Sequence, residues 1–159
     1  VKTLPEATLS IVGEGSLKAE IQETIKTYKL EQSVSLIGQV SMNELPQYYQ
    51  AADLFVLPTA AFEGLGMSTL ESFASGLPVV GTPAGATLEV LGELDPTLVT
   101  GGTGVEDLVQ GICGYFARSP AQRDALRVKA REVAEVQYNW DKAIDELEAL
   151  LDSLTHGTR

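Results

Sequence analysis

Hydrophobic residues along the chain follow two spacings in turn, and the first spacing predicts strands. A short run at residues 54–57 is apolar throughout and stops at Pro58, which is typical of a strand with both faces of its sheet covered. β-branched and apolar runs of the same kind end at glycines or prolines elsewhere. Together they predict strands at residues 8–12, 34–37, 54–57 and 79–80, and a last one at 98–99.

The second spacing predicts a helix after each strand. Leu17, Ile21 and Ile25 repeat at helical intervals behind the turn Gly13-Glu14-Gly15, and Ser41 with Glu44 has the spacing of a capping box that opens a helix through Tyr48 and Tyr49. Further helices are expected at residues 67–75, 87–91, 105–117, 120–136 and 140–154. The alternation predicts an α/β fold with a doubly wound parallel sheet and a helical C-terminal extension.

Four loops directly follow predicted strands, at residues 13–16, 38–42, 58–66 and 82–86. Ligands of open α/β sheets bind at the carboxyl ends of the strands. All four loops are therefore expected to face one crevice.

The most informative of these loops runs into the helix at residues 67–75. Gly64 and Gly66 allow the backbone to approach a ligand closely, and the free N–H groups of the helix start attract an anion such as a diphosphate. Glu63 can accept hydrogen bonds from sugar hydroxyls, and Glu71, farther along the helix, from the two hydroxyls of a ribose. The alternative is an ordinary helix with one loop acid and one solvated acid.

Composition and net charge limit the location and the kinds of partner expected for the chain. The 159 residues are 44% hydrophobic, enough for one globular domain, and no apolar run or cationic leader indicates a membrane span or export, so we expect a cytoplasmic protein. Eleven Lys and Arg against 22 Asp and Glu make the net charge -11, which argues against nucleic acid or an anionic membrane as partner. Anion binding must then rest on local amides and helix ends.

Neither a metal nor a cofactor is expected. Cys113 is the only cysteine, which excludes disulfides and thiolate clusters, and His156 lies in a polar tail. The sequence has no Asp-x-Asp pair to clamp a divalent ion on a diphosphate. The third glycine of a dinucleotide fingerprint beginning at Gly13 would fall at Lys18, so the Gly13 loop is expected to border the same diphosphate instead.

These segments resemble the C-terminal nucleotide-sugar-binding domain of retaining glycosyltransferases with the GT-B fold, family 4, also called group 1. The most specific block contains the family's Glu-x7-Glu signature, Glu63 and Glu71 here. The resemblance covers most of the chain, and the residues that carry it are 9–15, 36–40, 48–58 and 63–80.

The resemblance implies a role for each part of the glycine loop. Glu63 would contact the donor sugar, which makes it the catalytic candidate, although no nucleophile is assigned. The amides of Gly64, Leu65 and Gly66 would hold sugar and phosphate, and Glu71 would bind ribose.

Five further residues complete the expected donor site. By the same resemblance, Ser68 and Thr69 lie by the diphosphate, and the backbone near Gln39 and Val40 contacts the base. Gly13 belongs to the loop beside the diphosphate. The expected substrate is thus a nucleoside diphosphate sugar.

The chain departs from the family pattern in two places. The family's Arg and Lys for the diphosphate would precede Val1, and Gly85-Ala86 stands where the family often has Gly-Gly, which puts close ligand approach there in doubt. Because no initiator Met is present, we expect residues 1–159 to be a fragment that lacks the first strand and helix of its domain and the N-terminal acceptor domain. Such a fragment is expected to be inactive alone, and association of the parent with a membrane through the missing domain is left open.

The sequence predicts the donor-binding half of a retaining glycosyltransferase. Two alternatives stay open: a non-catalytic module that binds sugar nucleotides, and a GT-B relative that epimerises them.

Overall fold

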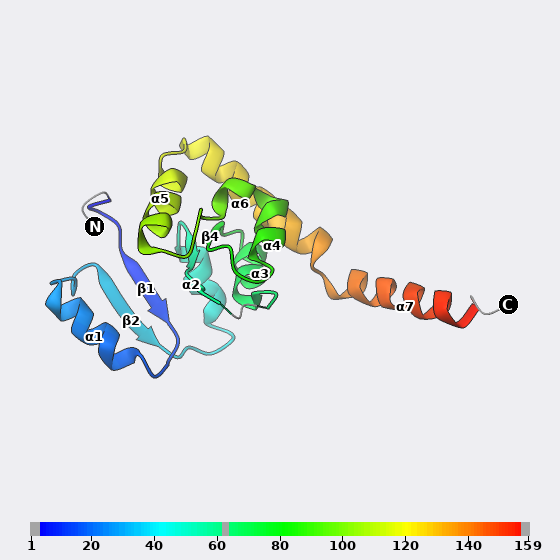
Figure 1. Cartoon of the computed structure of the whole chain (residues 1–159), viewed down its shortest axis with the longest axis horizontal. Helices are drawn as coiled ribbons and strands as arrows, with labels where there is room; N and C mark the ends of the chain where they lie inside the picture. Colours follow the sequence, from blue (N-terminus) through cyan, green and yellow to red (C-terminus); the bar gives the residue numbers. More distant parts are fainter. Residues whose placement is uncertain (1–3, 62–63, 157–159) are drawn as a thin grey trace. The chain divides into compact units, whose positions relative to one another are not determined.

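The computed structural model describes residues 4–61 and 64–156, and the chain forms two compact units that divide between Tyr48 and Tyr49. The elements follow one another in the order that the hydrophobic spacing predicts, strand and helix alternating from the N-terminus (Figure 1). The strands pair in parallel, which confirms the predicted α/β class. They form two two-stranded sheets, one in each unit.

The first unit is built from a strand, a helix and a strand: β1 (Leu9–Val12), α1 (Lys18–Thr27) and β2 (Val34–Gly38) (Figure 1). β1 and β2 are parallel, and their register shifts by one residue near the carboxyl ends. No residue of α1 is fully buried, and the strand residues are half-buried or exposed. This unit therefore has only a thin apolar interior of its own.

One half of the capping box predicted before α2 (Leu45–Ala51) is present, in which Glu44 accepts from Ser41. The N–H and the hydroxyl of Ser41 both donate to Oε2 of Glu44, at 3.0 and 2.7 Å. The helix itself begins at Leu45, the residue after Glu44. Pro46 is its second residue, where the missing N–H breaks no helical hydrogen bond.

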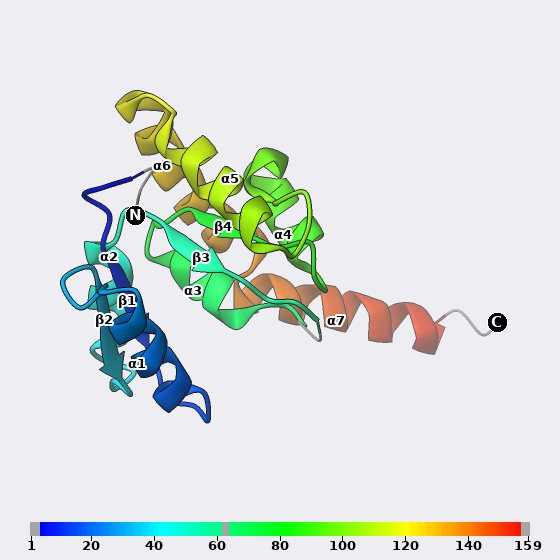
Figure 2. The same ribbon diagram turned by 60° about the vertical axis from the view of Figure 1, so that its left-hand side comes forward.

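The second unit contains the core of the molecule. β3 (Phe55–Leu57) and β4 (Val79–Gly81) are parallel, with Phe55 opposite Val79, and α3 (Met67–Ala74) connects them. α3 packs on both strands and on the long helix α6, whereas α5 packs on β4. α3 and α5 lie on opposite sides of the strand pair (Figure 2). Helices on both sides explain why Val79 and Val80 are fully buried.

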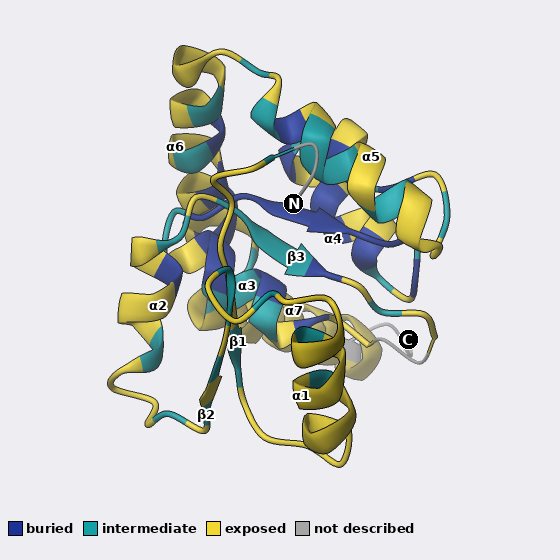
Figure 3. Ribbon diagram, turned by 90° about the vertical axis from the view of Figure 1, so that its left-hand side faces the viewer, coloured by how far each residue is buried: buried dark blue, intermediate teal, exposed yellow. Residues whose placement is uncertain are grey.

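The remaining elements are helical: α4 (Thr87–Leu94), the 3-10 helix η1 (Pro96–Leu98), α5 (Val105–Phe116), α6 (Pro120–Gln137) and α7 (Trp140–His156). The buried residues in Figure 3 concentrate on β4 and on the helix faces turned toward it. Tyr115, 2% exposed, donates from its hydroxyl to the carbonyl of Asp53 at 2.8 Å and so ties α5 to the start of β3.

One predicted strand is wrong. Residues 96–98 form η1 rather than a strand, because Pro96 starts a helical turn and Asp95 caps it by accepting from the N–H of Thr97 at 2.9 Å. Only Val99 continues the sheet, through a single parallel bridge to Gly81. The chain then turns through residues 100–104 into α5.

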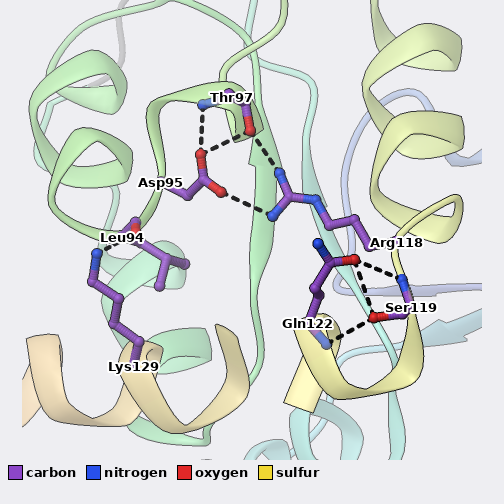
Figure 4. A network of polar contacts seen from close by, with 7 residues as sticks. All are labelled: Leu94, Asp95, Thr97, Arg118, Ser119, Gln122 and Lys129. Atoms are coloured by element: carbon purple, nitrogen blue, oxygen red, sulfur yellow. Dashed lines mark hydrogen bonds and ion pairs between the residues drawn. The ribbon is translucent and has the colours of Figure 1, made fainter. Parts of the chain in front are cut away.

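A polar network joins η1 to the α5–α6 junction (Figure 4). Arg118 donates to Oδ2 of Asp95 at 2.8 Å and to the hydroxyl of Thr97 at 2.6 Å. Across the same region Lys129 donates to the carbonyl of Leu94 at 2.6 Å, which satisfies an end of α4. These contacts hold α6 against the end of α4.

Candidate functional site

The start of α3 has an unusual backbone. Gly66 lies in the left-handed region with φ 71° and ψ 65°, and no side chain caps the helix. The carbonyl of Gly66 accepts from the N–H of Thr69 at 2.8 Å, which begins the helical turn. A helix start without a side-chain cap leaves its first N–H groups to a solvent molecule or a ligand. The start of α3 thus has the backbone geometry that an anion cradle requires, and its binding of an anion stays a prediction.

A second uncapped helix start lies beside the first. The N–H of Ala86, the residue before α4, donates to the carbonyl of Gly64 at 3.2 Å and joins the two loops. Gly85 has a left-handed φ of 54°, but Ala86 has φ -79°, a value that any residue adopts. The backbone therefore does not require glycine at position 86, where the family often has one. Whether the methyl group hinders a ligand stays a prediction.

The predicted donor residues of this loop differ in their accessibility. Gly64 and Leu65 are exposed, Ser68 is half-buried and Gly66 is buried. Thr69 is only 2% exposed, so of these residues its side chain has the least access to a ligand. Glu63, the catalytic candidate, lies outside the described residues.

Glu71 is held by a residue for which sequence analysis assigned no role. The hydroxyl of Tyr49, on the last turn of α2, donates to Oε2 of Glu71 at 3.0 Å. Burial of the phenol, together with the hydrogen bond to Glu71 and the negative charge of that carboxylate, raises the pKa of Tyr49 well above its usual value. The phenol therefore keeps its proton at neutral pH and donates it to Glu71.

No local pattern could have revealed this contact. Tyr49 and Glu71 are 22 residues apart and lie on different helices. The sequence places Tyr49 only in the helix that Ser41 opens. In the structure the residue is 9% exposed, and its hydroxyl points to the carboxylate of Glu71.

The first unit gathers three predicted residues at one end of its strands. Gly13 follows β1, and its N–H donates to the carbonyl of Gly38, the last residue of β2, at 2.8 Å. Gln39 and Val40 come next in the chain, exposed and half-buried respectively. Both loops thus leave the carboxyl ends of parallel strands, where α/β proteins bind ligands. Lys18 pairs with Glu14 at 2.7 Å and is exposed, as expected of a solvated helix residue.

Several cations of the second unit have structural partners. Arg118 pairs with Asp95, Arg127 donates to the carbonyl of Ala52 at 3.2 Å, and Lys129 donates to that of Leu94. Arg131 donates to the carbonyl of Ala74 at the end of α3. These four cations are engaged by helix ends and loops within the second unit.

Across residues 4–61 and 64–155, no three His, Cys, Asp or Glu side chains come together in a way that could hold a metal ion. In the same part of the chain, no helix has both the length and the apolar character needed to cross a bilayer.

Known proteins similar to this chain include three curated relatives. It is 31% identical over 153 residues to the amylovoran biosynthesis glycosyltransferase AmsK of Erwinia amylovora, covering 91% of this chain and 37% of that protein. It is 30% identical to the sulfoquinovosyl transferase SQD2 of Arabidopsis thaliana (91% and 28% covered). It is 29% identical to the mannosylfructose-phosphate synthase of Agrobacterium fabrum (89% and 31%). The chain thus spans about a third of the length of these relatives.

Solved structures share the fold. Sucrose-phosphate synthase from Thermosynechococcus elongatus superposes with a TM-score of 0.79 at 24% identity, over 98% of this chain and 40% of that one. Anabaena HepE in complex with UDP superposes with a TM-score of 0.81 at 21% identity, over 94% and 42%. These likenesses assign the chain to the fold of GT-B glycosyltransferases.

The family model described as glycosyl transferases group 1 matches residues 1–133. This match covers both units up to the last turn of α6, and it includes the glycine loop and Glu71. The chain therefore belongs to the group 1 family of glycosyl transferases.

Proposed function

We propose that this chain is the donor-binding part of a glycosyltransferase of family 4 that moves a sugar from a nucleoside diphosphate sugar to an acceptor with retention of configuration. The observation that carries the proposal is the start of α3. There an uncapped helix, a left-handed glycine and a carboxylate held by Tyr49 lie within six residues of one another, Gly66 to Glu71. The group 1 family match and the curated glycosyltransferase relatives support it.

Each part of the donor has a group of matching chemistry. The diphosphate would bind the N–H groups at the start of α3, where the helix dipole favours negative charge. Glu71 would accept hydrogen bonds from the ribose hydroxyls, and Glu63 from the sugar. The residues of the first unit, Gln39 and Val40, would contact the base through their backbone, with the loop of Gly13 beside the diphosphate.

Catalysis would then rest on positioning and on electrostatic stabilisation of the leaving diphosphate. Amides fixed at a helix start need no reorganisation as negative charge builds on the leaving group. The sequence has no Asp-x-Asp pair for a metal clamp, so the amides would carry this work. Any general base would come from the acceptor domain.

We further propose that the parent protein supplies a strand and a helix upstream of Val1. The described strands form two separate pairs, fewer than the doubly wound sheet that the sequence predicts. A further strand and the helix after it would bring the Arg and Lys that the family supplies to the diphosphate. Without these parts and the acceptor domain, the chain should bind donor without turnover.

Nuclear magnetic resonance tests donor binding directly. UDP, GDP and ADP are added in turn to the isotope-labelled chain, with inorganic phosphate as the control for simple anion binding. At least one nucleotide should shift the amide signals of residues 64–69 at millimolar concentration. Shifts confined to α5, α6 and α7 with all three nucleotides would contradict the proposal.

Activity is tested on the full-length parent. It should transfer or hydrolyse the sugar of a nucleoside diphosphate sugar, and Glu63→Ala should abolish this. Nucleotide affinity without turnover would show a binding module, and conversion of the free donor to an epimer would show an epimerase. Analysis of the product's anomeric configuration tests retention.

A further inference from the structure

Tyr49 is fixed in place by burial and by an aromatic contact. The residue is 9% exposed, and its ring meets that of Phe55 edge to face, with 5.7 Å between centroids and 81° between planes. Phe55 is the first residue of β3, so the tyrosine is attached to the sheet as well as to α2. A ring held in this way delivers its hydroxyl to one point.

That point is the carboxylate of Glu71. The hydroxyl donates to Oε2 at 3.0 Å and leaves Oε1 with both of its acceptor positions. Glu71 is half-buried, on the second turn of an eight-residue helix. An unrestrained glutamate has three rotatable bonds and loses that freedom when a ligand binds, whereas a glutamate already bonded to a fixed phenol has lost much of it beforehand.

We propose that Tyr49 is a positioning residue that holds the carboxylate of Glu71 in the orientation needed to accept the ribose hydroxyls of a nucleoside diphosphate. The inference rests on the proposed function, because it requires that Glu71 binds ribose. The inference adds Tyr49, from a separate helix, to the ribose contact of Glu71. It also makes Tyr49 responsible for the preference for ribose over a sugar without the 2′ and 3′ hydroxyls. The neutral phenol also offers its hydrogen bond without cancelling the charge of the carboxylate, as a cation in its place would.

The test compares two forms of each nucleotide, which differ only in the ribose hydroxyls. The chain is titrated with UDP, GDP and ADP and with their 2′,3′-dideoxy forms, and the amide signals of residues 64–69 give the affinities. Tyr49→Phe keeps the ring and removes the hydroxyl. Tyr48→Phe is the matched control, since Tyr48 is the preceding residue and has no contact with Glu71 among the described hydrogen bonds.

The wild type should prefer the ribonucleotide, and Tyr49→Phe should weaken its binding about tenfold while dideoxynucleotide affinity stays within about twofold. Tyr48→Phe should change neither. Adding Tyr49→Phe to Glu71→Gln should cost less than it does in the wild type, because the phenol acts through the carboxylate. This cycle also separates positioning from a general loss of structure, which thermal denaturation of each variant monitors.

Two results would overturn this inference and leave the proposed function standing. One is a wild type that prefers the ribonucleotide and a Tyr49→Phe variant that keeps the same preference. The other is an equal loss of affinity for both nucleotide forms, which would make Tyr49 a purely structural residue. A wild type that binds no nucleotide, or binds both forms equally, would overturn the proposed ribose contact of Glu71 and the inference with it.

Discussion

The helix starts of the second unit fall into two kinds. α6 is capped by a reciprocal pair of side chains, since Ser119 and Gln122 accept from each other's backbone N–H groups. At the start of α5 a side chain meets only the N–H of Gly104, which donates to Asp107 at 3.3 Å. The first turn of α3 and that of α4 have no such cap. The capped starts satisfy their own amides, whereas the uncapped ones keep theirs for other partners.

A helix start without a cap is less stable than a capped one, and its free N–H groups stay available to a ligand. A cap contributes about 1 kcal/mol to a helix, so α3 and α4 forgo that amount each. α3 is instead stabilised from beneath, by Phe73 and by its packing against α6. The end of the core proposed to bind the donor is thus held by apolar burial, and the α5–α6 junction by the polar network of Figure 4. Four predictions test this contrast, from the largest effect to the smallest.

Removal of the packing under α3 should have the largest effect. Phe73 is fully buried, so Phe73→Ala should lower the free energy of unfolding by about 3 to 5 kcal/mol through lost burial and a cavity. Urea denaturation followed by circular dichroism measures this. Met67→Ala on the same helix is the control, since Met67 is 61% exposed and should change stability by less than about 0.5 kcal/mol. A Phe73→Ala effect no larger than that of a cap would mean that packing does not hold α3.

The left-handed glycine comes next. Gly66→Ala places a side chain at φ 71° and should cost about 1 to 2 kcal/mol of stability. It should also weaken nucleotide binding, because the strained residue shifts the amides that follow it. Gly64→Ala is the control for stability: its new Cβ would have no atom within 4 Å, and denaturation midpoints should stay close to the wild type. Equal midpoints for both variants would show that the loop backbone is not constrained at Gly66.

Loss of a helix cap should lower stability without weakening nucleotide binding. Ser119→Ala removes the cap of α6 and should lower the free energy of unfolding by about 1 kcal/mol, with nucleotide affinity unchanged. Thr103→Ala, in the exposed loop before α5, serves as control and should be neutral. If Ser119→Ala weakened nucleotide binding without affecting stability, the division between structural and ligand-binding helix starts would be wrong.

The smallest expected effect is the loss of stability at low pH through Asp95. Burial alone would raise the pKa of Asp95, but the hydrogen bonds from Thr97 and the contact with Arg118 outweigh it and hold that pKa below its ordinary value of 3.8. The folded state therefore takes up the proton less readily than the unfolded state. The stability that results is complete above a pH of about 4 and is lost as the pH falls below that value.

Melting temperatures measured from about pH 6 to pH 2.5 should therefore fall more steeply for the wild type than for Asp95→Asn. Asp124→Asn on the exposed side of α6 is the matched control and should follow the wild-type curve. Parallel curves for all three proteins would show that the network of Figure 4 does not respond to acid.

The sequence by itself determined the order of elements and the nature of the loop that opens α3. The helices predicted at residues 67–75, 105–117 and 120–136 match α3, α5 and α6 to within one residue at each end. Apolar spacing, caps, glycines and prolines act between residues a few positions apart, so their effect is visible along the chain. The glycines at positions 64 and 66 likewise marked the loop that opens α3, and the structure adds that Gly66 is left-handed.

Only the tertiary structure decided what lies against that loop. The bond between Tyr49 and Glu71 spans 22 residues, and the one between Ala86 and Gly64 spans two helix starts, so neither leaves a local pattern. The expected strand at residues 98–99 was lost because Pro96 and Asp95 favour a helical turn, with Val99 alone reaching β4. Hydrogen bonds between distant residues depend on where packing brings their helices, and packing is a property of the folded chain as a whole.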